Sequence, residues 1–113
     1  MHKTVKILFS RDASAVLEYI HKKSITSKSE RIMYDSIQRK IELIKNNPFI
    51  GQPINKRLIP KEYLVEDYDN IYRLELSRFW RMLYTLRDNK IEIIAFVLDV
   101  LDHKQYNKKF KYN

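Results

Sequence analysis

Two arginines and a glutamate are spaced so that together they can hold a phosphate group. Arg73 and Glu75 alternate with apolar residues in one segment, and Arg81 opens the next alternating segment. If residues 77–79 form a turn between antiparallel strands, all three side chains project from one face of a sheet. A guanidinium binds phosphate through two parallel hydrogen bonds and stays charged at any physiological pH. The pattern predicts a cationic cluster that binds a nucleic-acid backbone. Glu75 is either an ion-pair partner of the arginines, which we favour, or a base.

The C-terminal segment supplies further groups that can move protons or contact RNA. Histidine, lysine and tyrosine can each protonate a leaving oxygen once their surroundings adjust the pKa. Aromatic rings can also stack on unpaired bases. Alternatively Tyr106 and Phe110, four residues apart, anchor a final helical turn. The residues concerned are His103, Lys104, Tyr106, Lys108, Lys109, Phe110 and Tyr112.

The N-terminal part predicts a strand and a helical hairpin. Residues 4–9 form a short apolar run, which favours a buried strand. Ser10 or Asp12 can cap a first helix. A second helix begins near Ser27, which has capping-box spacing with Glu30, and ends near residue 45. Apolar residues recur at helical spacing, as Ala13, Val16, Leu17 and Ile20 in the first helix and Met33, Ile37, Ile41 and Ile44 in the second.

The C-terminal half predicts an antiparallel meander of three strands over residues 71–76, 80–86 and 91–100. The last of these is nearly continuous in apolar residues, which predicts a central strand buried on both sides. Residues 102–113 form a short basic helix or a docked tail. In the middle strand, Trp80, Met82, Tyr84 and Leu86 are expected to face the helices, with Arg81, Leu83 and Thr85 opposite. Turns are expected at residues 77–79 and 87–90.

Residues 46–69 are interrupted by prolines and by the single glycine, so they predict an irregular connection. Its cations belong either to a solvated loop or to a basic rim that contacts an RNA backbone. The complete set of expected RNA-binding cations is Lys56, Arg57, Lys61, Arg78, Lys108 and Lys109.

Composition limits the classes of function. The 113 residues predict one α+β domain over residues 1–113, and a formal net charge of +8 favours polyanionic partners. Without cysteine there is no disulfide or thiolate site, and three isolated histidines lack metal-ligand spacing. One glycine excludes glycine-rich phosphate loops. We expect no metal, no cofactor, no membrane span and no signal peptide, hence a cytoplasmic protein.

Three stretches carry a resemblance to a known superfamily: NPFIGQPINKRLIPKEYL, NIYRLELSRFWRMLYTL and FVLDVLDHKQYNKKF. The chain resembles the RelE/ParE toxins of type II toxin–antitoxin systems, and is most similar to the archaeal RelE-like mRNA interferases. The stretches cover about the last two thirds of the chain, and the expected order of elements, β-α-α-β-β-β, fits that superfamily. The piece RMLY is the most specific.

For RelE-like members, the resemblance implies a metal-independent endonuclease that cuts mRNA on the ribosome and is neutralised by an antitoxin. We expect that antitoxin to be acidic and encoded nearby. The implied reaction is attack of a ribose 2′-hydroxyl on the adjacent phosphate. The resemblance also implies two arginines that stabilise the developing charge, together with one base and one acid that move protons.

The resemblance also assigns these roles to positions of this chain. Arg73 and Arg81 match the family's strand arginines, whereas Glu75 occupies a position that is basic in some members and so reverses its charge. The implied base is Glu75 or Lys56. The implied acid is His103, Lys104 or Tyr106, with Tyr112 as an alternative match for the tail tyrosine.

Two other classes of function remain open. A ParE-like toxin would act on DNA gyrase and would lack the ribonuclease residues. A binding module would bind RNA or an antitoxin without cutting, and Glu75 beside the arginines favours it because a carboxylate repels phosphate.

Overall fold

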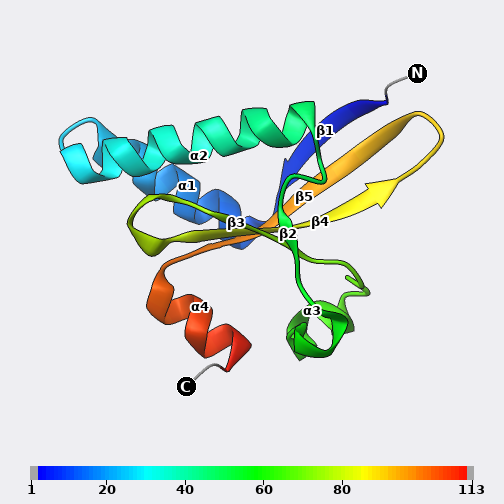
Figure 1. The fold of residues 1–113 in the computed structure, drawn as a ribbon. Helices are drawn as coiled ribbons and strands as arrows, with labels where there is room; N and C mark the ends of the chain where they lie inside the picture. Colours follow the sequence, from blue (N-terminus) through cyan, green and yellow to red (C-terminus); the bar gives the residue numbers. More distant parts are fainter. Residues whose placement is uncertain (1–2, 112–113) are drawn as a thin grey trace.

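A computed structural model describes residues 3–111 as one five-stranded sheet with helices on both faces (Figure 1). The strand order is β1-β5-β4-β3-β2. The hairpin of α1 and α2 covers one face, and α3 and α4 lie on the other. The elements are β1 (Thr4–Phe9), α1 (Arg11–Ser24), α2 (Lys28–Asn46), β2 (Gln52–Pro53), η1 (Lys56–Leu58), α3 (Lys61–Val65), β3 (Tyr72–Glu75), η2 (Ser77–Phe79), β4 (Arg81–Asp88), β5 (Glu92–Leu101) and α4 (His103–Phe110). The predicted α+β class and order of the main elements are confirmed.

The first strand lies at the edge of the sheet. Within residues 3–111, β1 pairs only with β5, in parallel, and its side chains alternate between exposed and half-buried. The expectation of a buried strand was therefore wrong, because an apolar run does not reveal whether a second neighbour covers the strand. The prediction of a central strand near residues 91–100 is confirmed, since β5 lies between β1 and β4.

The helix starts show which polar residues satisfy free backbone N–H groups. Ser10 caps α1, its Oγ accepting from the backbone N–H of Ala13 at 3.0 Å, so Asp12 is not the cap. At α2 the expected capping box is absent: the Ser27 side chain donates to the carboxylate of Glu30 instead. The capping box occurs at α4, between Asp102 and Gln105.

The predicted alternation in β4 is confirmed, and both faces are buried. Met82, Tyr84 and Leu86 pack in the core beneath α1 and α2, together with half-buried Trp80. Leu83 packs on the opposite face in a second core. That second core also contains residues from α3, α4, β5 and the connecting segments: Ile59, Tyr63, Ile71, Leu98, Tyr106 and Phe110.

The connection between α2 and β3 is more regular than predicted. It contains β2, which pairs with β3, and the five-residue helix α3, which follows Pro60. The backbone of Gly51 closely approaches Tyr84. Its N–H donates a hydrogen bond to the Tyr84 hydroxyl at 2.9 Å, which leaves no room for a side chain. A Cβ there would lie 2.8 Å from the same oxygen.

Candidate phosphate-binding site

Arg73, Glu75 and Arg81 share the face of the sheet that α4 covers. Arg73 and Glu75 are two residues apart in β3, and the β3–β4 register places Glu75 opposite Arg81. Side chains at such positions point to the same side of a sheet. Arg73 lies opposite Leu83, which belongs to the core on the α3–α4 side. The predicted convergence of the two arginines is therefore present.

Glu75 lies between the two guanidinium groups. Its Oε1 is 3.3 Å from Nε of Arg73, and its Oε2 is 3.5 Å from Nε of Arg81. The two arginine side chains are only 23% and 14% exposed, whereas the Glu75 side chain is 56% exposed. The carboxylate is thus the most solvent-exposed member of the group. Its removal would leave two fixed cations facing one anion position.

Tyr106 of α4 contacts both arginines. The hydroxyl accepts a hydrogen bond from Nη1 of Arg73 at 2.9 Å. The Arg81 guanidinium carbon lies 4.9 Å from the ring centroid, within range of a cation–π contact. The ring is buried and stacks on Phe110 with centroids 4.5 Å apart. The anchoring alternative is therefore confirmed for both aromatic residues, and their burial excludes them from stacking on bases.

His103 extends the cluster at the first turn of α4. An arginine only donates hydrogen bonds, so Nδ1 of His103, 3.1 Å from Nη1 of Arg81, acts as the acceptor. Nε2 of the same ring lies 3.1 Å from Nδ2 of Asn107. A role for His103 as general acid requires an imidazolium, whose Nδ1 proton would break the bond from Arg81.

Two residues of the cluster were absent from the sequence-based set. Gln52 of β2 accepts from Nη2 of Arg73 at 2.6 Å and fixes that guanidinium from its other side. Phe79 of η2 contacts His103 edge to face, and its carbonyl accepts from Nη1 of Arg81. For Phe79, the only signal in the sequence was its place in the expected turn, two residues before Arg81. Gln52 could not be found, because its strand is two residues long.

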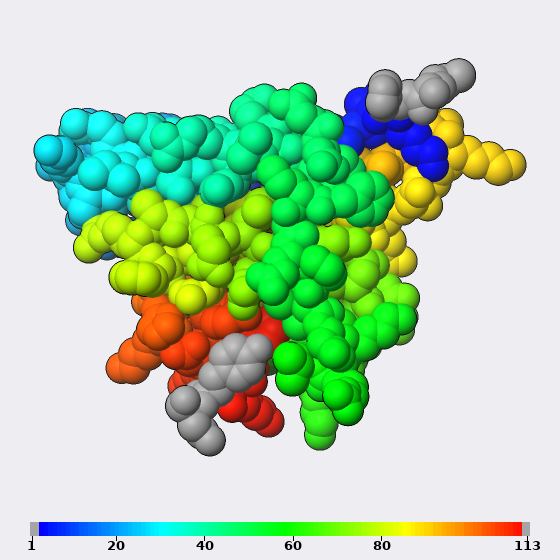
Figure 2. All heavy atoms as spheres, in the orientation of Figure 1, coloured from blue at the N-terminus to red at the C-terminus, as the bar shows by residue number. Residues whose placement is uncertain are grey.

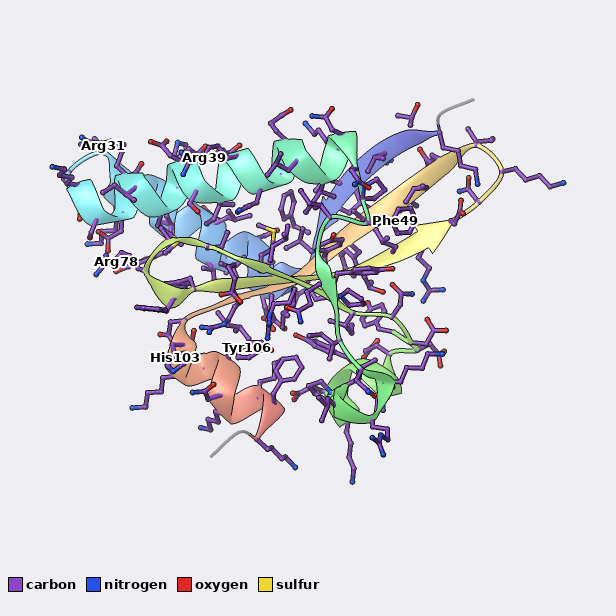
Figure 3. The ribbon with its side chains drawn as sticks, viewed as in Figure 1. Arg31, Arg39, Phe49, Arg78, His103 and Tyr106 are labelled. Atoms are coloured by element: carbon purple, nitrogen blue, oxygen red, sulfur yellow. The ribbon has the colours of Figure 1, made fainter. Side chains whose placement is uncertain are left out.

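The other predicted residues occupy three separate places. Lys104 is exposed on α4 beside His103. Arg78 faces the opposite side, next to Glu30 at the start of α2 (Figure 3). The remaining cations lie on or near η1, α3 and the end of α4: Lys56, Arg57, Lys61, Lys108 and Lys109.

Lys109 belongs to a second polar cluster. Its Nζ is 3.5 Å from Oδ2 of buried Asp99 and 3.4 Å from Oε1 of Glu62. The Tyr63 hydroxyl donates to Asp99, and burial followed by the Asp99 charge raises the pKa of Tyr63. These bonds tie α3 and α4 to β5. The ammonium already has two carboxylate partners, so Lys109 is less available to phosphate than Lys104.

Within residues 3–111, no three histidine, aspartate or glutamate side chains are grouped so that they could hold a metal ion. In the same range, no helix has both the length and the apolar character that crossing a bilayer needs. The candidate site consists of two guanidiniums, one carboxylate, one imidazole and one phenol. Such a set can bind an anion and exchange protons with it.

A comparison with solved structures identifies a similar fold. The YoeB/ParE toxin from Agrobacterium tumefaciens superposes with a TM-score of 0.61, covering 87% of this chain and 98% of its own. The two sequences are 16% identical. No protein-family model matches the chain, and no curated protein matches its sequence. The similarity therefore establishes the fold.

Proposed function

We propose that this chain is the toxin of a type II toxin–antitoxin system and cleaves mRNA on the ribosome without a metal. The observation that carries the proposal is the convergence of Arg73 and Arg81 on one anion position beside α4. The fold shared with the Agrobacterium toxin and the net charge of +8 also support it. Its place of action would be the cytoplasm, where translating ribosomes are found.

In the proposed reaction, the 2′-hydroxyl oxygen of a ribose attacks the neighbouring phosphorus. The bond from phosphorus to the 5′-oxygen breaks, which leaves a 2′,3′-cyclic phosphate and a 5′-hydroxyl. Arg73 and Arg81 would replace Glu75 with the phosphate as their partner and would stabilise the charge that develops on it. The displaced Glu75 carboxylate would accept the 2′ proton, since it is exposed and adjacent.

The leaving 5′-oxygen requires a proton from a second group. His103, which contacts Arg81, and the adjacent Lys104 are exposed at the start of α4 and are the better placed candidates. Tyr106 is buried and its hydroxyl is directed at Arg73, so it acts as a positioning residue in this scheme. Glu75 lies between the two arginines, whereas Lys56 lies in η1, so Glu75 is the stronger candidate base.

The proposed partner is a cognate antitoxin, acidic and encoded nearby. A protein with a net charge of +8 attracts an acidic chain at long range. An acidic segment laid over the exposed side of Arg73 and Arg81 would compete directly with mRNA. An adjacent short reading frame rich in aspartate and glutamate is the genomic observation that supports this pairing.

The experiment is primer extension on a translating ribosome with purified wild type, Arg81→Ala and Arg39→Ala. Arg39 is exposed on α2, on the other face of the sheet, and controls for the loss of one positive charge (Figure 3). We expect cleavage by wild type and Arg39→Ala, and a rate about 100-fold lower for Arg81→Ala, the typical cost of removing one charge-stabilising donor. Intact mRNA with the wild type, or unchanged cleavage by Arg81→Ala, contradicts the proposal. A melting curve confirms that each variant is folded.

One observation favours a second candidate, a module with this fold that binds RNA or an antitoxin and does not cut. Glu75 already pairs with both arginines and cancels one of their two positive charges, which weakens their attraction for phosphate. Ribosome binding with intact mRNA, unaffected by Arg81→Ala, selects this candidate. Inhibition of gyrase in a supercoiling assay would instead select a ParE-like action.

A further inference from the structure

Phe79 is a large apolar ring left in solvent beside the arginine cluster. Its exposed fraction is 74%, the highest of the phenylalanine, tyrosine and tryptophan residues within 3–111. An isolated exposed ring needs no special explanation. This one differs because it adjoins His103, which contacts Arg81.

The backbone holds Phe79 in an unfavourable conformation. Arg78 and Phe79 both have positive φ, 59° and 64°, although neither is glycine. Left-handed conformations are disfavoured for residues with a Cβ, and such conformations are concentrated at functional sites. A glycine at either position would relieve the strain in the turn.

Bonds to neighbouring elements fix this turn. The backbone N–H of Ser77 donates to Oγ of Ser36 in α2 at 3.1 Å, and that of Trp80 donates to the Ser77 carbonyl at 3.2 Å. The Phe79 carbonyl accepts from the Arg81 guanidinium. The backbone of Phe79 is thus bonded to Arg81, one of the two arginines proposed to bind phosphate.

The ring and the imidazole together form the rim of the site. The Phe79 and His103 centroids are 6.4 Å apart with an interplanar angle of 62°. In the space-filling view, the yellow-green turn that contains Phe79 adjoins the orange first turn of α4 (Figure 2). A phosphate held by Arg73 and Arg81 would place the neighbouring nucleotide near this rim.

We propose that Phe79, supported by His103, is a stacking platform for an unpaired base of single-stranded RNA adjacent to the phosphate bound by Arg73 and Arg81. The inference rests on the phosphate-binding part of the proposed function and does not require cleavage. Every base offers a π face to an aromatic ring, and only unpaired bases can leave their own stack. The substrate class is therefore a single strand, read with little base preference at this position.

The test measures binding and stacking separately from cleavage. The probe is an eight-nucleotide RNA that is 2′-O-methylated throughout, so that it cannot be cut, and that carries 2-aminopurine at a central position. Stacking on an aromatic ring quenches 2-aminopurine fluorescence. The proteins are wild type, Phe79→Ala, Phe79→Leu, Phe79→Trp and the control Phe49→Ala, whose ring is 61% exposed in another part of the molecule (Figure 3).

We expect wild type, Phe79→Trp and Phe49→Ala to bind the probe and quench it. Phe79→Ala should raise Kd about tenfold, within the range for loss of one base–aromatic stack, and abolish the quenching. Phe79→Leu keeps an apolar side chain of similar size and should also lose the quenching. The same RNA annealed to its complement should bind without quenching of the 2-aminopurine fluorescence.

Three results would overturn the inference: no binding of the single strand by wild type, equal behaviour of Phe79→Ala and Phe49→Ala, or binding and quenching by Phe79→Leu equal to those of wild type. The last would show that an apolar side chain is enough and that the aromatic ring does not stack on the base. The cleavage assay is independent of these results. Stacking without cleavage supports this inference and rejects the nuclease, whereas cleavage that Phe79→Ala does not slow, together with unchanged quenching, rejects only the inference.

Discussion

The Tyr106 hydroxyl accepts a hydrogen bond from Nη1 of Arg73 at 2.9 Å, which joins the third strand to the last helix across 33 positions of the chain. The same ring lies beneath the Arg81 guanidinium. One buried side chain therefore sets the position of both cations. This makes α4 part of the candidate phosphate-binding site as well as part of the core.

Replacing Tyr106 by phenylalanine separates the contribution of the hydroxyl from that of the ring. Tyr106→Phe keeps the packing on Phe110 and the ring beneath Arg81, and it removes only the hydroxyl. We expect the free energy of unfolding to fall by about 1 kcal/mol, the usual net value of one hydrogen bond. Urea denaturation measures it. Tyr19→Phe, which changes an exposed ring on α1, is the control and should cost much less.

Replacing Glu75 by glutamine removes the negative charge between the arginines. Glu75→Gln should raise affinity for a single-stranded oligonucleotide several-fold and steepen the dependence of log K on log salt, because two cations become free to pair with phosphate. Stability should change by less than about 1 kcal/mol, since the carboxylate is largely exposed.

The same variant distinguishes the two roles that remain open for Glu75. If the carboxylate is the base, cleavage falls although binding strengthens; if it is only an ion-pair partner, both rise together. Glu42→Gln is the matched control, since Glu42 pairs with Lys45 on exposed α2. An affinity that rises equally in both variants would reflect net charge alone.

The shared face of Arg73, Glu75 and Arg81 was predictable because it follows from local rules. Strand side chains alternate with period two, and a short turn sets the register of two adjacent strands. The cluster therefore follows from residues close together in sequence. The support from Tyr106 was only one of two alternatives, because it depends on how a distant helix docks.

The features that sequence reasoning missed depend on tertiary structure. β2 consists of two residues whose pairing with β3 gives no periodic pattern. The edge position of β1 depends on the absence of a neighbour on its outer side. The exposure of Phe79 depends on positive φ values at two residues other than glycine, a conformation that the sequence does not indicate.

Gly51 should tolerate no side chain. Its missing Cβ leaves room for Tyr84 and Tyr72, which would lie 2.8 to 2.9 Å from a methyl group there. The close contacts are with the hydroxyl and ring of Tyr84 and with Cβ of Tyr72, so Gly51→Ala should destabilise the protein by about 1–3 kcal/mol, as overpacking does. Thermal melting measures the change. A double variant, Gly51→Ala with Tyr84→Phe, removes the hydroxyl from the clash and should recover part of the loss beyond simple addition.

Stability should fall in alkaline solution through the buried tyrosines. Burial raises the pKa of Tyr84 to about 12, and it also raises that of Tyr63. In the unfolded chain a tyrosine has a pKa near 10. Between about pH 10 and 12 the unfolded state therefore loses a proton that Tyr84 keeps in the folded state, so stability that is fully present below pH 10 declines as pH rises.

Tyr84→Phe tests this account of the alkaline decline. The variant loses the bonds of the hydroxyl to the Pro48 carbonyl and the Gly51 N–H, so it should be less stable than wild type at neutral pH. Its free energy of unfolding should nevertheless decline less steeply above pH 10, by up to about 1.4 kcal/mol per pH unit, the slope that one proton contributes. Urea denaturation at a series of pH values gives both slopes. Parallel curves for the two proteins would show that Tyr84 does not contribute to the decline.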